Sequence, residues 1–420
     1  MDTKADAGLA PVSTPERVQE LDVLRGIALF GILVVNIDDY APAPVSTADG
    51  VTQGFINVVA HGSFYPLFSP LFGIGFALFL ERATARGTRG VRLYVRRLAS
   101  LLAIALLQII LLEDRNILVR YAFLAVPLLL FWRASARTCL IAAMACLTLA
   151  VVRVPINRAL ARRQDPAAAA ATREAIAAEQ ARRQAEWRRV ADTRSYFEIA
   201  AYRAQWKVPE ALRWSADLRR NPSLFHILAM FLLGAAVWRS RLLLNPSSSR
   251  RLLRTVVVAG IIGGVVGNLV VILGPDSGPL PWLASRPITT TAVGFLGNTL
   301  LTLAYVAGVV LVMSGADSVW RRRLAPLAVI GRMGLTNYLW QSVVMSLLFL
   351  PYGLRLEGAF ALWIHPLFAV VIFLTHLPLS TWWLARFRFG PAEWIWRTAT
   401  YGRVQPMRLR TEEARMARPA

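Results

Sequence analysis

The chain has few of the residues from which metal and disulfide sites are built, with two cysteines and four histidines in 420 residues. Cys139 and Cys146 lie seven residues apart, and on one helix this spacing separates them by about 10 Å, too far for a disulfide. The sequence also lacks a serine elbow, a His-Glu-x-x-His motif and any cysteine or histidine spacing that suits a metal. We therefore expect no metal site and no tightly bound cofactor, and we interpret both cysteines as small packing residues.

Acidic residues are also scarce, since 25 Asp and Glu stand against 47 Lys and Arg for a net charge of +22. A balance this basic can indicate nucleic-acid binding, but here the arginines fall in alternate loops between apolar segments. They gather at 82–97, 133–137, 239–254 and 321–323 and in the tail after 385, whereas 37–56 contains no Lys or Arg. This is the positive-inside pattern of membrane proteins. It predicts cytoplasmic termini and no nucleic-acid partner.

Long apolar runs, by contrast, are abundant. The chain is 56% hydrophobic, and its repeated runs of about 20 residues are long enough to cross a bilayer as helices. We predict ten spans, at 21–41, 57–80, 97–113, 116–132, 137–152, 223–239, 252–273, 289–313, 324–350 and 359–384. The predicted fold class is all-α, a polytopic transmembrane helix bundle in the bacterial inner (cytoplasmic) membrane, with the lipid bilayer as a partner. The first 20 residues have no apolar core, so we do not interpret them as a signal peptide.

The predicted organisation has five parts. They are a cytoplasmic tail (1–20), a five-span half (21–152), a large extracytoplasmic helical loop (153–222), a second five-span half (223–384) and a basic cytoplasmic tail (385–420). Between Asp165 and Arg194 the loop is rich in Ala, Glu, Gln and Arg, which favour helix. Its alternating charge favours a solvated helical hairpin, and the alternative is a cap over the outer mouth of a cavity.

Polar side chains interrupt the apolar spans, where lipid makes them costly. The candidate binding residues are Asp22, Arg25, Asn36, Gln108, Asn116, Arg120, Asn337 and Gln341. We expect them to share one polar chamber that is reached past Arg25 and covered by the hairpin. In it Arg120 would lie on the same helical face as Asn116 and pair with a carboxylate from the first span. The alternatives are a snorkelling role for Arg25 and hydrogen bonds between helices for the amides.

Glycines at four-residue spacing predict close helix packing. Gly260 with Gly264, and Gly263 with Gly267, let a neighbouring helix approach closely. We expect the same of Gly73 and Gly75, which lack the third glycine and the preceding strand of a nucleotide-binding loop.

Four segments together carry a resemblance to a known family. They are LDVLRGIALFGILVVN, SFYPLFSPLFGIGFALFLERA, GRMGLTNYLWQS and LARFRFGPAEWIWRTATYG. Over 17–403 the chain resembles the YeiB family of bacterial membrane proteins, which carry domain of unknown function 418. Its amino-terminal pattern is similar to that of transmembrane acyltransferases, including the lysosomal heparan glucosaminide acetyltransferase. The resemblance implies transfer of an acyl group from cytoplasmic acyl-CoA, as cosubstrate, to a small-molecule, glycan or lipid acceptor in the envelope or for export.

The resemblance also implies roles for individual residues. Arg92, Arg96 and Arg97 would hold the phosphates of the coenzyme, although topology alone also accounts for arginines there. His61 lies roughly where the heparan acetyltransferase places its catalytic His, which makes it the candidate base.

The chain departs from the family pattern at one pair of positions. The family commonly shows a His and an Asp where this chain has Gln108 and Asn116, and amides cannot act as bases. This departure keeps two other functions open, a transporter or permease-like protein and a non-catalytic relative. Either one would use the same polar interior.

Overall fold

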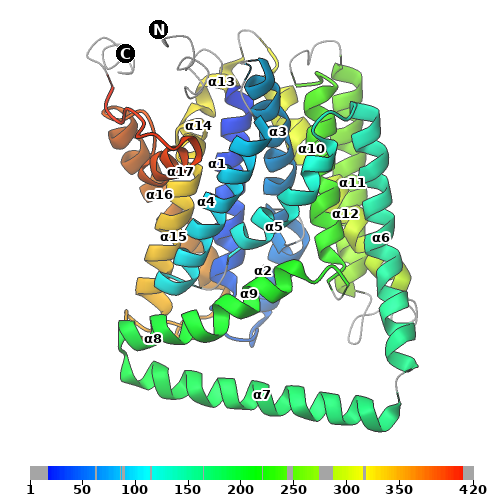
Figure 1. Cartoon of the computed structure of the whole chain (residues 1–420), viewed down its shortest axis with the longest axis vertical. Coiled ribbons are helices and arrows are strands. Elements are labelled where there is room, and N and C mark those ends of the chain that lie inside the picture. Colours follow the sequence, from blue (N-terminus) through cyan, green and yellow to red (C-terminus); the bar gives the residue numbers. More distant parts are fainter. Residues whose placement is uncertain are drawn as a thin grey trace.

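The computed structural model describes residues 18–61, 64–85, 87, 90–113, 116–163, 165–219, 221–243, 249–273, 287–315 and 318–409. In these ranges the chain is helical and forms no strand, apart from an isolated bridge between Phe387 and Arg408. The helices stand side by side as a bundle, with further helices crossing one end (Figure 1). The predicted all-α class is therefore confirmed. Most of the predicted first tail and the end of the last one, 1–17 and 410–420, lie outside the described residues.

Eleven of the described helices build the bundle. They are α1 (Gln19–Asp38), α3 (Phe64–Ala85), α4 (Gly90–Leu111), α5 (Leu118–Leu128), α6 (Ala136–Arg162), α10 (Ser223–Arg239), α11 (Arg250–Leu273), α12 (Pro287–Met313), α14 (Ala325–Arg332), α15 (Gly334–Phe349) and α16 (His365–Leu384). Shorter helices accompany them: α2 (Thr47–Ile56), a π-helical turn (Asn57–His61), α13 (Val319–Arg323) and α17 (Pro391–Tyr401). Two 3₁₀ turns, Leu129–Phe131 and Leu362–Ile364, adjoin α5 and α16.

Six of the described helical segments are long and apolar enough to cross a membrane. They are Pro66–Ala85, Gly90–Leu111, Ala136–Asn157, Arg250–Leu273, Thr290–Met313 and Leu362–Leu384. Segments Leu118–Phe131 and Ser223–Arg239 are apolar but shorter. The predicted span 324–350 is broken at Met333, where α14 ends and α15 begins. By this number of apolar helices the chain is a multi-pass membrane protein.

Glycines set the closest helix crossings. A side chain on Gly331 would meet the Asp22 carbonyl of α1, and one on Gly26 would meet the Leu327 carbonyl of α14. Gly73 of α3 packs in the same way against Phe231 of α10. Along α11, glycines Gly260, Gly264 and Gly267 face α12, as the spacing predicts. Gly75 differs from the prediction, because no other helix lies within 4 Å of its Cβ position.

Residues 153–162 of the predicted loop continue α6, and the described residues 165–219 form a helical hairpin across one end of the bundle (Figure 1). Its outer arm is α7 (Pro166–Thr193), which is exposed over most of its length. The returning arm consists of α8 (Tyr196–Tyr202), a π-helical turn (Arg203–Lys207) and α9 (Val208–Ala216). This arm packs on the bundle, where the Tyr196 hydroxyl donates to the Leu111 carbonyl at 2.9 Å. The hairpin is therefore solvated along one arm and covers the bundle with the other.

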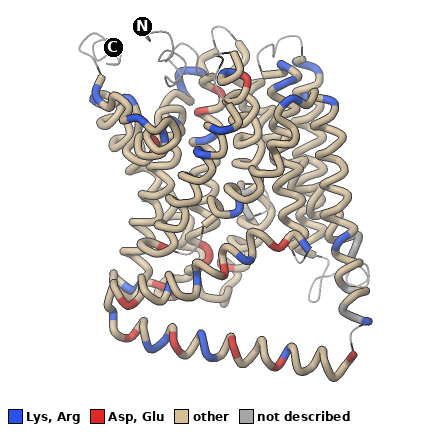
Figure 2. The backbone as a smooth tube through the Cα atoms, in the orientation of Figure 1, with Lys and Arg blue, Asp and Glu red and all other residues tan. Residues whose placement is uncertain are grey.

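Charge separates the two ends of the bundle (Figure 2). Basic residues gather at the end of the bundle where α1 begins and where α17 lies (Figure 1). We call this the termini end. Residues of both signs mark the hairpin, at what we call the hairpin end. Two cavities correspond to these two ends.

Candidate functional site: two cavities joined by polar side chains

The arginine cavity, of about 240 Å³, lies towards the termini end between α1, α3, α4, α5, α14, α15 and α17. Its polar lining residues are Asp22, Arg25, Tyr94, Arg97, Tyr121, Arg332, Tyr338, Glu393, Trp396 and Arg397. Four guanidinium groups thus stand against two carboxyl groups. The remaining wall is aromatic and aliphatic and includes Phe68, Phe72 and Phe76. Such a cavity suits a ligand with an anionic part and an apolar part.

All four sequence segments that carry the family resemblance converge on this cavity. The first supplies Asp22 and Arg25, and the second supplies the phenylalanines and Gly75. The third supplies Tyr338 with the residues around the α14–α15 break, and the fourth supplies Glu393, Trp396 and Arg397. Gly75 therefore faces the cavity, which explains why it does not pack against a helix.

Asp22 and Arg25 form an ion pair with 2.6 Å between Arg25 Nη1 and Asp22 Oδ1. Their three-residue spacing places them on one face of α1, as predicted. The Asp22 side chain is 8% exposed and that of Arg25 is 35% exposed. Arg25 therefore combines a partly solvated position with a place in the cavity wall.

Arg97 is held by an aromatic side chain of α17. Its guanidinium carbon lies 3.9 Å from the centre of the Trp396 ring, and the Trp396 indole donates to the Arg97 carbonyl at 2.9 Å. Stacking of this kind orients a guanidinium while leaving its edge free to donate. Arg96 instead donates to the Ala399 carbonyl at 3.2 Å and is exposed, as is Arg92. Neither Arg92 nor Arg96 is among the described lining residues of the arginine cavity, so their part in holding the coenzyme phosphates stays a prediction.

Glu393 caps the helix that begins at the break in span 324–350. Its Oε1 accepts from the amides of Leu335 (2.6 Å) and Thr336 (3.2 Å), and its Oε2 accepts from the Thr336 hydroxyl. The first amides of a helix have no partner within it, so a carboxylate there stabilises the helix start. Burial raises the pKa of Glu393 above its ordinary value, against the opposing effect of these hydrogen bonds.

Two tyrosines add polar atoms to the cavity wall. Tyr94 is 1% exposed, and its hydroxyl has no hydrogen-bond partner within the described part of the chain. Tyr121 shares a hydrogen bond of 2.8 Å with Ser69. A buried hydroxyl that bonds nothing is unusual in proteins, so Tyr94 points to a ligand group or water as its partner.

Gln108 and Asn116 are brought together, as their family positions imply. Asn116 donates to Gln108 Oε1 at 2.8 Å, and Gln108 donates to the Ser342 hydroxyl at 2.8 Å. Asn116 Oδ1 also accepts from the Leu118 amide at 2.7 Å, which starts α5. The Tyr338 hydroxyl, at the wall of the arginine cavity, bonds Gln108. The amide pair therefore borders the cavity from the hairpin side.

Several predicted members of the chamber lie elsewhere. Arg120 is exposed, and because α5 begins after Asn116, the two do not share a helical face. Asn337 donates to the Ile330 carbonyl and to Ser380, while Gln341 donates to the Leu29 carbonyl. For these two amides the alternative of hydrogen bonding between helices is therefore the one observed.

Asn36 and His61 complete the predicted set. Asn36 is buried on α1 at 1% exposure and is not among the described lining residues of the arginine cavity. His61 ends the π-helical turn Asn57–His61, and its side chain lies outside what the structure describes. His61 therefore stays a prediction.

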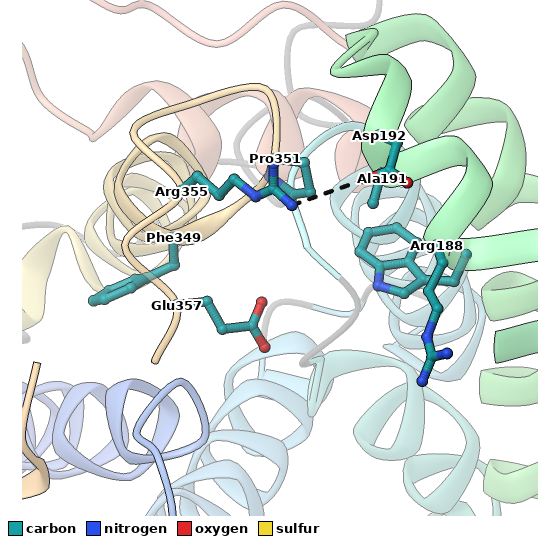
Figure 3. Close-up of a pocket in the computed structure, with 8 residues that line it drawn as sticks. Arg188, Ala191, Asp192, Phe349, Pro351, Arg355 and Glu357 are labelled. Carbon is teal, nitrogen blue, oxygen red and sulfur yellow. Dashed lines mark ion pairs between the residues drawn. The ribbon is translucent and has the colours of Figure 1, made fainter. Parts of the chain in front are cut away.

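The hairpin cavity, of about 260 Å³, is lined by Tyr40, Gln184, Trp187, Tyr202, Arg203, Lys207, Leu350 and Glu357. A groove of about 470 Å³ adjoins it and shares Trp187 and Glu357 (Figure 3). The Tyr40 hydroxyl donates to Glu113 Oε2 at 3.0 Å, and the Glu113 amide donates to the Gln108 carbonyl at 3.1 Å. Side-chain hydrogen bonds thus join Tyr338 to Gln108 and Tyr40 to Glu113, and a backbone bond just after α4 links the two pairs. The predicted single chamber is in fact two cavities with these groups between them.

Comparisons with known proteins agree with the resemblance drawn from the sequence. Residues 237–403 match the family model "Protein of unknown function (DUF418)", and residues 17–158 match "Heparan-alpha-glucosaminide N-acetyltransferase, catalytic". The uncharacterized protein YxaH of Bacillus subtilis is 30% identical over 97% of this chain and 100% of its own length. The uncharacterized protein YeiB of Escherichia coli is 27% identical over 93% of this chain and 98% of its own. No solved structure matches.

The two family models meet in the arginine cavity, since Arg25 and Arg97 come from the first matched segment and Arg332 and Arg397 from the second. With a relative matched end to end, the chain belongs to the YeiB-like DUF418 family of membrane proteins, which is related to the transmembrane acyltransferases.

Proposed function

We propose that the protein is an acyltransferase of the bacterial cytoplasmic membrane that binds acyl-CoA in the arginine cavity and passes the acyl group to an envelope or exported acceptor. One observation carries the proposal: four arginines face an aromatic wall in a cavity built from all four family segments. Guanidinium groups bind phosphates with paired hydrogen bonds. The phenylalanine wall suits the thioester arm and the acyl group.

The proposed topology puts this cavity where acyl-CoA is present. We keep the ten spans that apolar length predicts and place both termini in the cytoplasm because of the arginine distribution. The termini end then faces inwards. The hairpin then faces outwards, which is tolerated because long loops cross the membrane regardless of charge.

The size of the cavity limits the ligand. Small-molecule pockets usually begin at about 300 Å³, and this cavity of about 240 Å³ is below that range. We infer that the cavity holds the acyl-pantetheine end of the cosubstrate, while the nucleotide end stays outside it, close to its arginines. The acyl group that fits is a short one.

The chemistry requires a base for the acceptor and donors for the developing oxyanion. The hydroxyls of Tyr94, Tyr121 and Tyr338 are the donors nearest to a bound thioester in this proposal. Asp22 is paired with Arg25, and Glu393 caps α15, so neither is our choice of base. We assign that role to His61 or to Glu113, the buried carboxyl group beside the Gln108–Asn116 pair.

A thermal-shift titration of the purified protein tests the binding step, because a ligand that binds the folded form raises apparent stability. We expect acetyl-CoA to raise the melting temperature and Arg97→Gln or Arg397→Gln to weaken binding by about tenfold. Arg254→Gln is the matched control, since Arg254 is exposed on α11, which supplies none of the described lining residues of the cavity. Absence of a shift with acyl-CoA of any chain length would contradict the proposal.

Release of free thiol from acetyl-CoA separates catalysis from binding. One observation favours a transporter or a non-catalytic relative: both carboxyl groups of the arginine cavity already have structural partners. On that alternative, acyl-CoA or another amphiphilic anion binds without thiol release, and vesicles show solute flux. Loss of thiol release in His61→Ala, with unchanged melting temperature, supports the enzyme.

A further inference from the structure

A second ligand site is indicated at the hairpin end. We propose that the hairpin cavity binds a small molecule that carries a carboxylate or phosphate group, gripped by Arg203. The binding itself is independent of the arginine cavity. That its occupant is the acceptor of the acyl group rests on the function proposed above.

Arg203 carries the proposal. It is 3% exposed, it lines the hairpin cavity, and its Nη1 has no hydrogen-bond acceptor within the described residues. Its guanidinium carbon lies 5.9 Å from the centre of the Tyr352 ring, a contact that does not satisfy that N–H group. A buried guanidinium with an unsatisfied N–H is costly, and an anionic ligand would remove the cost.

The backbone of the hairpin brings a second cation to the same cavity. Arg203 and Lys207 open and close the π-helical turn, in which the Val208 amide bonds the Arg203 carbonyl. A turn of this width places residues four apart on nearly the same face, so both side chains reach the cavity. Single π-helical turns occur often at functional sites. Among the described lining residues, two cations, Arg203 and Lys207, therefore stand against one carboxyl group, that of Glu357.

Aromatic and polar groups complete the site. The Trp187 and Tyr202 rings lie 5.3 Å apart between their centres, and both border the cavity. The hydroxyl of Tyr40 lies at the bundle side, bonded to Glu113. Two aromatic rings, tilted by 47° to one another, beside hydrogen-bonding groups suit a polar ring such as a sugar. A sugar acid or sugar phosphate therefore fits this combination better than a bare anion.

The adjoining groove gives the ligand a way in. Arg355 reaches from the loop after α15 towards Asp192 of α7, with 3.9 Å between Arg355 Nη2 and Asp192 Oδ1 (Figure 3). Both side chains are more than half exposed, so the ion pair contributes little stability. Glu357 lies between Phe349 and Arg188 in this view, with its carboxylate directed away from Phe349 (Figure 3). The hairpin is thus fastened to the bundle here by a contact that opens at low cost.

The test measures binding of glucuronate, glucose 6-phosphate and uncharged glucose to the full-length protein at constant ionic strength, by calorimetry. We expect the two anions to bind and glucose to bind at least about tenfold more weakly. Arg203→Gln should weaken anion binding by about tenfold or more and Arg203→Lys less, because Lys keeps the charge. Arg213→Gln is the matched control, exposed on α9 of the same arm, and should bind as the wild type.

A lipid headgroup is the other source of the same anionic chemistry. To test for it, the stability of the protein is compared in nanodiscs with phosphatidylglycerol and in nanodiscs with phosphatidylcholine alone. Stabilisation by the anionic lipid that depends on Arg203, without binding of the soluble anions, assigns the site to a headgroup. Two results overturn the proposal: no anion binds in either arm, or Arg203→Gln binds like the wild type. If Arg203→Gln fails to fold, Lys207→Gln takes its place. Acetyl-CoA binding, measured on the same samples, reports on the arginine cavity separately.

Discussion

At the residue scale, the side chains of this protein divide into those that hold helices and those that face a cavity. Polarity in the sequence does not separate the two groups. Asn337 and Gln341 are as polar as Gln108, yet they bond the carbonyls of Ile330 and Leu29 on neighbouring segments. Arg97 and Arg96 are adjacent, and the helix turns one towards the cavity and the other away from it. Which polar side chains share a cavity can therefore be predicted from a sequence only where the groups that they bond are known.

The carboxyl group of Glu393 gives a pH dependence. Burial raises its pKa above the value in the unfolded chain, so the folded state holds the proton more tightly. The stability contributed by that proton is fully present below the unfolded pKa and is lost as pH rises through the folded pKa. The melting temperature of the wild type minus that of Glu393→Gln should therefore fall as the pH rises above the ordinary pKa of a glutamate, 4.5. A difference that stays constant or rises would contradict the assignment.

The amide pair gives a stability prediction. Gln108→Leu removes the hydrogen bonds to the buried Ser342 and to the half-buried Asn116, which still donates to the Ala105 carbonyl at 2.9 Å. We expect a loss of about 1–3 kcal/mol in the free energy of unfolding, measured by denaturant titration in detergent. Gln180→Leu on the exposed face of α7 is the control and should change stability little. Equal effects of the two substitutions would refute the role of Gln108.

At the element scale, the α1–α14 crossing sets the position of the ion pair in the cavity wall. Gly331 lies against the Asp22 carbonyl, one turn before Gly26. Gly331→Ala inserts a methyl group into backbone contact and should cost about 1–3 kcal/mol. It should also weaken acyl-CoA binding, because Asp22 and Arg25 move with α1. Gly308→Ala is the control, since the Cβ position there is in ordinary contact with Val257; comparable thermal unfolding of both variants would argue against the crossing.

At the scale of the whole molecule, the proposed topology can be checked by labelling with a membrane-impermeant maleimide. In a chain with Cys139→Ala and Cys146→Ala, Ala178→Cys on the exposed face of α7 should react in intact spheroplasts. Arg322→Cys, exposed next to the break between α13 and α14, should react only after lysis. The reverse labelling pattern would indicate the opposite orientation in the membrane, with the arginine cavity on the outer side.

The helices and their packing are largely predictable from this sequence, because apolar length and glycine spacing are local properties. Span 223–239 coincides with α10, and the glycines of α11 face α12 as expected. The cavity is less predictable. Arg25 and Arg97 stand out as charges at the ends of spans. Arg332 lies inside the predicted span 324–350 without being among the predicted site residues, and Arg397 resembles an ordinary arginine of the basic tail. They reach the cavity because the chain breaks at Met333 and because α17 folds back on α4, through contacts between residues far apart in sequence.

Both halves of the chain contribute to the wall of the arginine cavity, and this constrains how the sequence can evolve. The stretches that match two separate family models each contribute half of its guanidinium groups, so neither stretch can drift independently of the other. A chimera that joins the first half of this protein to the second half of a distant relative should assemble a bundle but mismatch where Trp396 of the second half meets Arg97 of the first. Selection would then act on the pair of halves as one unit.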